Sequence, residues 1–171
     1  MNKYNAILEK YPLLFSNPDN LQTPFALFGF ECDEGWYDII NNMCNAMYSG
    51  FSSANFMLQE TEKRIAEFPD REDLFELKKE YEKRLAKEKK RLPLVAQIKE
   101  KFGTLRVYLE GGSNTPRGIA EMAELMSETT CEICGNKGKT YTLGWHKTLC
   151  YEHAIERYTK SAVDKHNQEE L

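Results

Sequence analysis

The chain has 171 residues, 41% of them hydrophobic, which is enough for one folded domain with a small appendage. Its net charge is −4 and its pI about 5.5, which argues against a dedicated duplex-binding protein, because such proteins carry a basic excess that neutralises phosphates. No apolar run approaches the roughly 18 residues of a membrane span, and MNKYNAILEKYPLLF lacks the features of a signal peptide. We therefore expect a cytoplasmic protein without a membrane partner.

The first 50 residues predict an apolar arm followed by one amphipathic helix. Residues 1–24 combine the apolar YPLLF with SNPDNLQTP, a turn-forming stretch that contains two prolines. The helix is predicted to begin after Asp33, which can cap it, and to end near Gly50. Its inward face is formed by Trp36, Ile39, Ile40, Met43, Cys44 and Met47, which recur at helical spacing.

Residues 51–92 predict an antiparallel helical hairpin that projects from the body. Pro69 divides the segment into two amphipathic helices, because proline removes a backbone donor and ends the first one. The second helix starts with acidic residues and ends in the basic run KRLAKEKKR, an order that complements the helix dipole. This basic end is either a solvated helix surface or a contact for nucleic acid or an acidic protein.

Period-two alternation on both sides of Gly103 predicts a β-hairpin. Lys99 and Lys101 share one face of its first strand, and Arg106 and Tyr108 share one face of its second. If the two faces coincide, they form a basic and aromatic patch suited to a phosphate, a nucleotide or an acidic partner. The alternative is an ordinary exposed sheet face that carries charged side chains.

A further helix is predicted from Thr115 to Thr129, with Pro116 in its first turn. Its inward face is expected to hold the large apolar residues Ile119, Met122, Leu125 and Met126.

The strongest chemical signal is CEICGNKGKTYTLGWHKTLCYEHA. Two close pairs, Cys131 with Cys134 and Cys150 with His153, are separated by fifteen residues. Five cysteines, an odd number, favour a metal site or free thiols over a disulfide framework in a cytoplasmic chain. Three thiolates and one imidazole suit tetrahedral Zn²⁺. The order of knuckle, hairpin and helix is typical of a treble-clef zinc finger, and a looser zinc ribbon is the alternative.

Four protein ligands would close the coordination sphere, so we expect the zinc to be structural rather than catalytic. The zinc-binding module is placed at residues 131–161, after a body at residues 1–130 that includes the helical hairpin. Residues 162–171 are polar and predict a flexible tail.

His146 is a competing ligand and the basis of an alternative function. In His-metal nucleases with treble-clef-like sites, the general-base histidine lies on the hairpin, where His146 lies here. That class needs further ligands on the following helix, which offers only Glu152 and Glu156. We therefore favour the interpretation that His146 is an ordinary hairpin residue beside Trp145, and we assign no catalytic residue.

The acidic stretch FGFECDEGWYD is a second place for chemistry. Glu31, Asp33 and Glu34 could hold Mg²⁺ or act as acid and base, and opposite Arg106 they could form a nucleotide site. The alternative is a solvated loop with a helix cap. Cys32 and Cys44 are expected to be free thiols.

Three blocks of the chain together resemble a family of small bacteriophage and prophage proteins. The blocks are FGFECDEGWYDII, IKEKFGTLRVYLEGG and CEICG…GWHKTLCYEHA, and they cover about a third of the sequence. The resemblance implies phage origin and action in the host cytoplasm, with no established activity to carry over. It supports the same four zinc ligands and marks Trp36, Lys101, Gly103 and Arg106 for testing.

We therefore expect an α+β fold with a small antiparallel sheet, packed helices, an inserted helical hairpin over residues 51–92 and a C-terminal treble-clef-like zinc module. The favoured function is a non-enzymatic phage accessory protein that binds a host or competitor protein. The chain itself would then be an inhibitor, such as an anti-CRISPR or other anti-defence protein. The predicted binding surface is formed by Trp36, Lys99, Lys101, Arg106 and Tyr108. The alternatives are a nucleic-acid-binding accessory protein, and a nucleotide-binding protein or zinc-finger nuclease.

Overall fold

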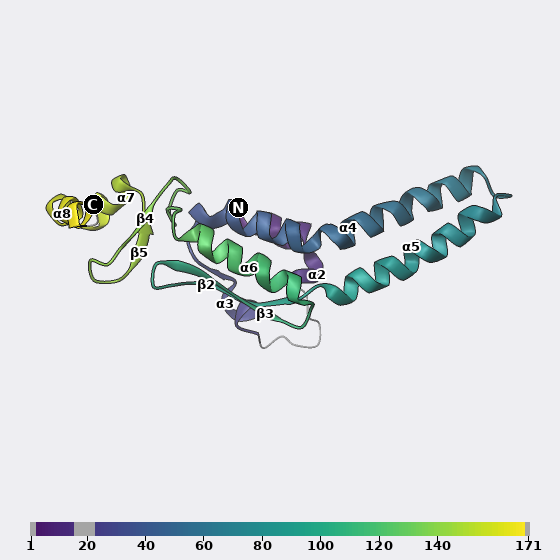
Figure 1. The fold of residues 1–171 in the computed structure, drawn as a ribbon, viewed down its shortest axis with the longest axis horizontal. Helices are drawn as coiled ribbons and strands as arrows, with labels where there is room; N and C mark the ends of the chain where they lie inside the picture. Colours follow the sequence, from purple (N-terminus) through teal and green to yellow (C-terminus); the bar gives the residue numbers. More distant parts are fainter. Residues whose placement is uncertain (1–2, 16–22, 170–171) are drawn as a thin grey trace.

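A computed structural model describes residues 3–15 and 23–169, and it confirms the predicted α+β class (Figure 1). In chain order the elements are α1 (Tyr4–Lys10), α2 (Pro12–Phe15), α3 (Pro24–Phe28), β1 (Phe30–Glu31), η1 (Glu34–Trp36), α4 (Tyr37–Glu67), α5 (Glu72–Arg91), β2 (Leu94–Lys101), β3 (Thr104–Glu110), α6 (Asn114–Ser127), β4 (Lys139–Tyr141), β5 (Lys147–Leu149), α7 (Tyr151–Arg157) and α8 (Lys160–Glu169). Residues 16–22, most of the predicted SNPDNLQTP turn, lie outside the described residues, so that turn stays a prediction.

The N-terminal arm forms part of the core. Its apolar side chains Tyr4, Ile7, Tyr11 and Leu14 are all buried. Tyr4 stacks on Phe30 of β1 with ring centroids 4.2 Å apart. The arm therefore packs against the body, and its buried side chains belong to the main hydrophobic core.

Helix α4 runs without a break from Tyr37 to Glu67, so the predicted helix end at Gly50 is wrong. A Cβ at Gly50 would lie 2.6 Å from Oε2 of Glu88 on α5. That atom is the end of a flexible side chain, so the contact does not require glycine, and α4 simply continues through this position. The predicted inward face of α4 is buried, with Ile40 and Cys44 fully so.

Helices α4 and α5 form the predicted hairpin, which projects from the body at the end of the molecule opposite to α7 and α8 (Figure 1). Leu74 of α5 is buried between the helices. Lys78 of α5 pairs with Glu62 of α4 at 2.8 Å. The rest of the hairpin surface is mostly exposed and charged, as the sequence predicts.

The larger sheet has the strand order β1-β2-β3 and is mixed rather than purely antiparallel as predicted. Strands β2 and β3 form the predicted antiparallel hairpin, whereas the short strand β1 pairs with β2 in parallel. Because side chains alternate along a strand, Ile98 and Leu105 face the core, and Lys99 and Arg106 form a row on the other face.

The predicted inward face of helix α6 is wrong for three of its four residues, whereas Ile119 is partly buried against the core, as predicted. Met122, Leu125 and Met126, expected inward, are 60%, 59% and 46% exposed. The buried side chains are the small ones, namely Pro116, Ala120, Ala123 and Ser127.

The reason is the close approach of α6 to the edge strand β3. The Leu105 N–H donates to Ser127 Oγ at 2.9 Å, and the Val107 N–H donates to Glu124 Oε1 at 2.8 Å. These bonds satisfy the free edge of the sheet. They hold the helix so near that small residues fit against the strand and the large apolar ones point away.

The C-terminal module has a small core of its own, formed by Cys131, Tyr141, Leu149, Cys150, Ala154 and Val163. Val163 belongs to α8 and is fully buried. The expectation of a flexible tail from residue 162 is therefore wrong as far as Glu169. The segment is polar, and only one of its apolar side chains, Val163, is fully buried, so its composition does not indicate a packed helix.

Candidate metal centre

Cys131 and Cys134 lie in a tight turn of the backbone. The Gly135 N–H donates to Cys131 O at 2.9 Å, and the Cys131 N–H donates to Asn136 O at 2.8 Å. Gly135 has a φ of +78°, which disfavours a side chain at this position. The CxxCG spacing therefore folds as the predicted knuckle.

Cys150 and His153 come from the start of α7, where Cys150 is the N-cap. Nδ1 of His153 lies 3.1 Å from Sγ of Cys150 and 3.5 Å from Sγ of Cys131. The sulfurs of Cys134 and Cys150 are 3.8 Å apart. All four predicted ligand atoms lie within 4.8 Å of one another. The predicted set is thus brought together and could hold a metal ion.

The thiols of the cluster differ in their ionisation. Burial opposes ionisation of Cys131, but hydrogen bonds to the backbone of Cys150, Cys134 and Ile133 lower its pKa to about 7. Desolvation, together with the neighbouring sulfurs, raises the pKa of Cys134 to about 11. A cation among the four atoms would favour the thiolate forms of both cysteines.

The segment DEGW docks the cluster on the body. The Gly35 N–H donates to Glu132 O at 2.7 Å, and a Cβ at Gly35 would lie only 2.3 Å from Cys131 O. Trp36 is fully buried, and its Nε1–H donates to Thr130 O at 2.8 Å. The predicted place of Trp36 in a binding surface is therefore wrong. Its ring belongs to the apolar face that leads into α4, and its single donor is satisfied by the module.

A buried charge network makes the second contact between body and module. Nζ of Lys147 lies 2.6 Å from Oε2 of Glu132 and 3.2 Å from Oε2 of Glu100. Beside it, the Thr148 hydroxyl donates to Gly103 O at 2.6 Å. Burial raises the pKa of Glu132, although the Lys147 ammonium opposes this shift. Sequence reasoning missed Glu132 and Lys147, because no motif or period marks a charge that becomes buried in an interface.

The two hairpin faces coincide, as the patch interpretation requires. Lys99 lies opposite Arg106 in the register, and its Nζ lies 5.2 Å from the centre of the Tyr108 ring. Glu31 pairs with Lys99 in the parallel register and accepts a 2.7 Å hydrogen bond from Gln97 Nε2. The acidic stretch and the basic hairpin therefore meet at Glu31.

The rest of the acidic stretch contributes to packing and to the surface. The Asp33 N–H donates to Glu132 Oε1 at 3.3 Å, and Glu34 lies exposed near Lys3. Cys32 and Cys44 are free thiols, as predicted. Burial raises the pKa of each to about 12, which keeps them protonated at neutral pH.

His146 lies outside the metal cluster. Its ring contacts that of Phe102, with centroids 6.2 Å apart. Trp145, the next residue, is 66% exposed. Phe102 is alone among the described non-glycine residues in having a positive φ, 56°. No sequence motif marks Phe102, and only its unusual place before a turn glycine could have drawn attention to it.

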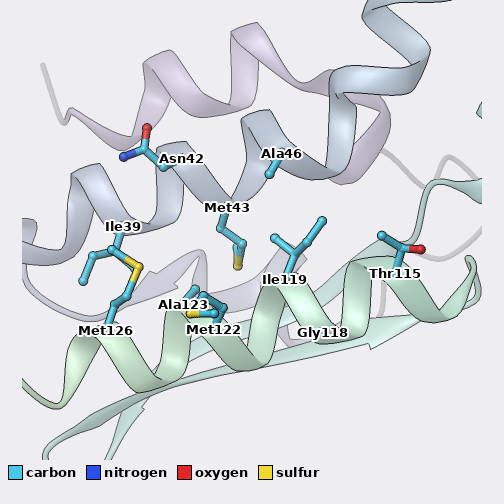
Figure 2. Close-up of a pocket in the computed structure, with 10 residues that line it drawn as sticks. All are labelled: Ile39, Asn42, Met43, Ala46, Thr115, Gly118, Ile119, Met122, Ala123 and Met126. Atoms are coloured by element: carbon cyan, nitrogen blue, oxygen red, sulfur yellow. The ribbon is translucent and has the colours of Figure 1, made fainter.

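An apolar groove of about 400 Å³ lies between α4 and α6. In Figure 2 the side chains of Met43 on α4 and of Ile119 on α6 point toward one another across it. Its lining residues are Ile39, Asn42, Met43, Ala46, Thr115, Gly118, Ile119, Met122, Ala123 and Met126. Sequence reasoning missed the groove because it assigned the large residues of α6 to the core.

Comparison of the chain with protein-family models, with curated proteins and with solved structures finds no match. Among the described helices, none is long and apolar enough to cross a membrane.

Proposed function

We propose that this chain is a non-enzymatic phage accessory protein in which a structural Zn²⁺ stabilises the fold and an apolar groove binds a protein of the host or of its defence system. The observation that carries the proposal is the orientation of α6, which directs its large apolar side chains away from the core. The phage setting rests on the resemblance of the three sequence blocks.

The spacing of the four ligand atoms supports zinc. Bond lengths of roughly 2.3 Å to sulfur and 2.05 Å to nitrogen imply tetrahedral edges of roughly 3.8 Å between sulfurs and 3.6 Å between sulfur and nitrogen. The Cys134–Cys150 separation of 3.8 Å and the Cys131–His153 separation of 3.5 Å fit these edges, whereas the Cys150–His153 separation of 3.1 Å is shorter than the edge between sulfur and nitrogen. Three soft ligands and one imidazole favour Zn²⁺ over Mg²⁺ or Ca²⁺. With four protein ligands the ion would contribute folding free energy.

The groove supports a protein partner. Monomeric proteins rarely leave a contiguous apolar surface uncovered unless it binds something. Met122 and Met126 are 60% and 46% exposed and supply flexible and polarisable side chains that adapt to a partner, whereas Met43 on the opposite wall is buried. A groove between two helices suits the apolar face of an amphipathic helix. We propose such a helix, from a host or competitor protein, as the occupant.

The groove is tested by capture from infected-host lysate, with the native chain and two matched variants. Met122→Glu places a charge in the groove, whereas Phe56→Glu places one on the projecting hairpin at a side chain of nearly equal exposure, 60% against 59%. A protein partner should be retained by the native chain and by Phe56→Glu and lost by Met122→Glu. Capture that is insensitive to Met122→Glu would contradict the groove.

The zinc is tested by native mass spectrometry with and without a chelator. One tightly held zinc per chain is expected, and replacing Cys150 with serine should abolish it. A purified native chain that carries no metal, or carries it equally well without Cys150, would contradict the ligand assignment.

The nucleotide-binding alternative is weakened by the position of Trp36. That hypothesis used the loop from Glu31 to Trp36 opposite Arg106, whereas the Trp36 ring is fully buried and hydrogen-bonded to the module.

A further inference from the structure

The turn between β2 and β3 holds an unusual residue in a strained conformation. Phe102 and Gly103 have φ values of 56° and 80°, the combination of a type I′ hairpin turn. Asparagine, aspartate or glycine normally occupies the first of these positions, because a bulky side chain disfavours the left-handed conformation. Burial does not compensate for the strain, since the Phe102 ring is 60% exposed. A strained residue that holds an aromatic ring in solvent points to function.

Phe102 is one end of a continuous strip of cationic and aromatic side chains, here named the hairpin strip: Lys99, Lys101, Phe102, Arg106 and Tyr108. Nζ of Lys101 lies 5.3 Å from the centre of the Phe102 ring, and Nζ of Lys99 lies 5.2 Å from that of Tyr108. Lys99 lies opposite Arg106 in the strand register, between these two ends. The strand positions 97 to 101 span about 13 Å at the usual rise, and the His146 ring lies beside Phe102, with centroids 6.2 Å apart.

Among the described residues, 3–15 and 23–169, the three cations of the hairpin strip, Lys99, Lys101 and Arg106, have no ion-pair partner. Arg106 donates one hydrogen bond to the carbonyl of Leu105. Glu31 lies beside Lys99 and accepts a hydrogen bond from Gln97. The strip is therefore most positive at its Lys101 end, in a chain whose net charge is −4.

We infer that the hairpin strip binds single-stranded nucleic acid. Unpaired bases stack on exposed aromatic faces while the phosphates between them meet lysine and arginine, which is how strand-binding surfaces gain affinity without sequence preference. A duplex keeps its base faces within its own stack and would use only the charges. An acidic peptide would likewise need the cations but not the strained Phe102 ring. The inference does not depend on the groove, which lies between α4 and α6.

The test is fluorescence anisotropy of the zinc-loaded full chain with labelled dT12, rU12 and a duplex of 12 base pairs. Three phosphate contacts predict a slope of about −2 in log affinity against log salt, so raising salt from 50 to 200 mM should weaken strand binding about 20-fold. Both single strands should bind more tightly than the duplex. A preference for rU12 over dT12 would identify RNA as the source of the ligand.

Variants separate the rings from the charges. Phe102→Gly suits the positive φ and keeps the turn, so it should remain folded while strand affinity falls roughly 5- to 150-fold, the value of one stacked base. Tyr108→Ala should lose a similar factor. Phe56→Ala removes from α4 a ring that is 59% exposed, against 60% for Phe102, and should leave strand affinity unchanged. Glu31→Gln should tighten binding by removing a negative charge beside Lys99.

Three results would overturn the inference. The first is no binding of either strand at 20 mM salt. The second is retention of full affinity by folded Phe102→Gly and Tyr108→Ala, which would leave a purely electrostatic surface. The third is a polyglutamate peptide that binds as tightly as dT12 and loses affinity in the same variants, which would assign the strip to an acidic protein.

Discussion

Gly35→Ala tests the contact between the body and the metal cluster. The new Cβ would lie 2.3 Å from Cys131 O and 2.4 Å from Glu132 O. Both are backbone atoms, so the knuckle must move by about 0.7 Å or more to reach the shortest contact that a Cβ tolerates. This movement would also break the 2.7 Å hydrogen bond from the Gly35 N–H to Glu132 O.

The cost has two parts. Overpacking at a rigid site costs about 1–3 kcal/mol, and a buried donor or acceptor left without its partner costs about 1–3 kcal/mol. We therefore expect Gly35→Ala to lower the free energy of unfolding by about 2–6 kcal/mol. Because the displaced carbonyl belongs to the ligand Cys131, zinc affinity should fall at least about tenfold, which corresponds to only about 1.4 kcal/mol.

The assays are urea unfolding of the zinc-loaded chain and competition for zinc with a chromophoric chelator. The control is Gly118→Ala, because Gly118 lies within α6 and a Cβ there would have nothing within 4 Å. Alanine should raise helix stability by about 0.5–1 kcal/mol at that position. If Gly35→Ala leaves both zinc affinity and the free energy of unfolding unchanged, the reasoning about this docking contact is refuted.

Three further changes probe the interface and the strip. Lys147→Met should lower the free energy of unfolding, measured by urea titration, by about 3–5 kcal/mol, because it leaves buried carboxylates without a cation. Adding Glu132→Gln should recover part of this loss. An unchanged free energy of unfolding in Lys147→Met would argue against the network. Trp145→Phe leaves the buried Trp36 as the single tryptophan, and its emission should shift to longer wavelength when a chelator removes the metal; an unchanged spectrum would mean that the docking contact survives without metal. Phe102→Gly should raise the free energy of unfolding by up to about 1 kcal/mol by relieving the left-handed strain, as measured by urea unfolding, and a loss of stability would show that the ring serves the fold.

The cluster of four candidate ligands could be predicted from sequence because the spacing within each pair is local. Each close pair lies within one turn, so spacing alone brings Cys131 to Cys134 and Cys150 to His153. The docking of Gly35 on Glu132 joins residues nearly a hundred positions apart through backbone atoms. No side-chain pattern records such a contact, and only the crowding of backbone atoms around a glycine of ordinary φ reveals it in space.

Periodicity located the apolar stripes correctly but not always their direction. On α4 the stripe faces the core, and Trp36 follows that pattern rather than the surface assignment. On α6 the large residues Met122, Leu125 and Met126 face outward, because hydrogen bonds from β3 to Ser127 and Glu124 hold the helix too close for them. A period of 3.6 residues identifies an apolar face but does not distinguish a core from a partner.

The three sequence blocks FGFECDEGWYDII, IKEKFGTLRVYLEGG and CEICG…GWHKTLCYEHA meet around the Cys/His cluster. The first contributes Gly35 and Trp36, the second contributes Gly103 in the β2–β3 turn, and the third contributes the knuckle and Thr148. Gly103 is also crowded by backbone, since a Cβ there would lie 3.2 Å from the Lys147 backbone nitrogen. The module therefore supports the turn that holds Phe102 in its strained conformation. If the metal stabilises the module, its removal should weaken strand binding at the hairpin strip, although none of the four ligands belongs to that strip.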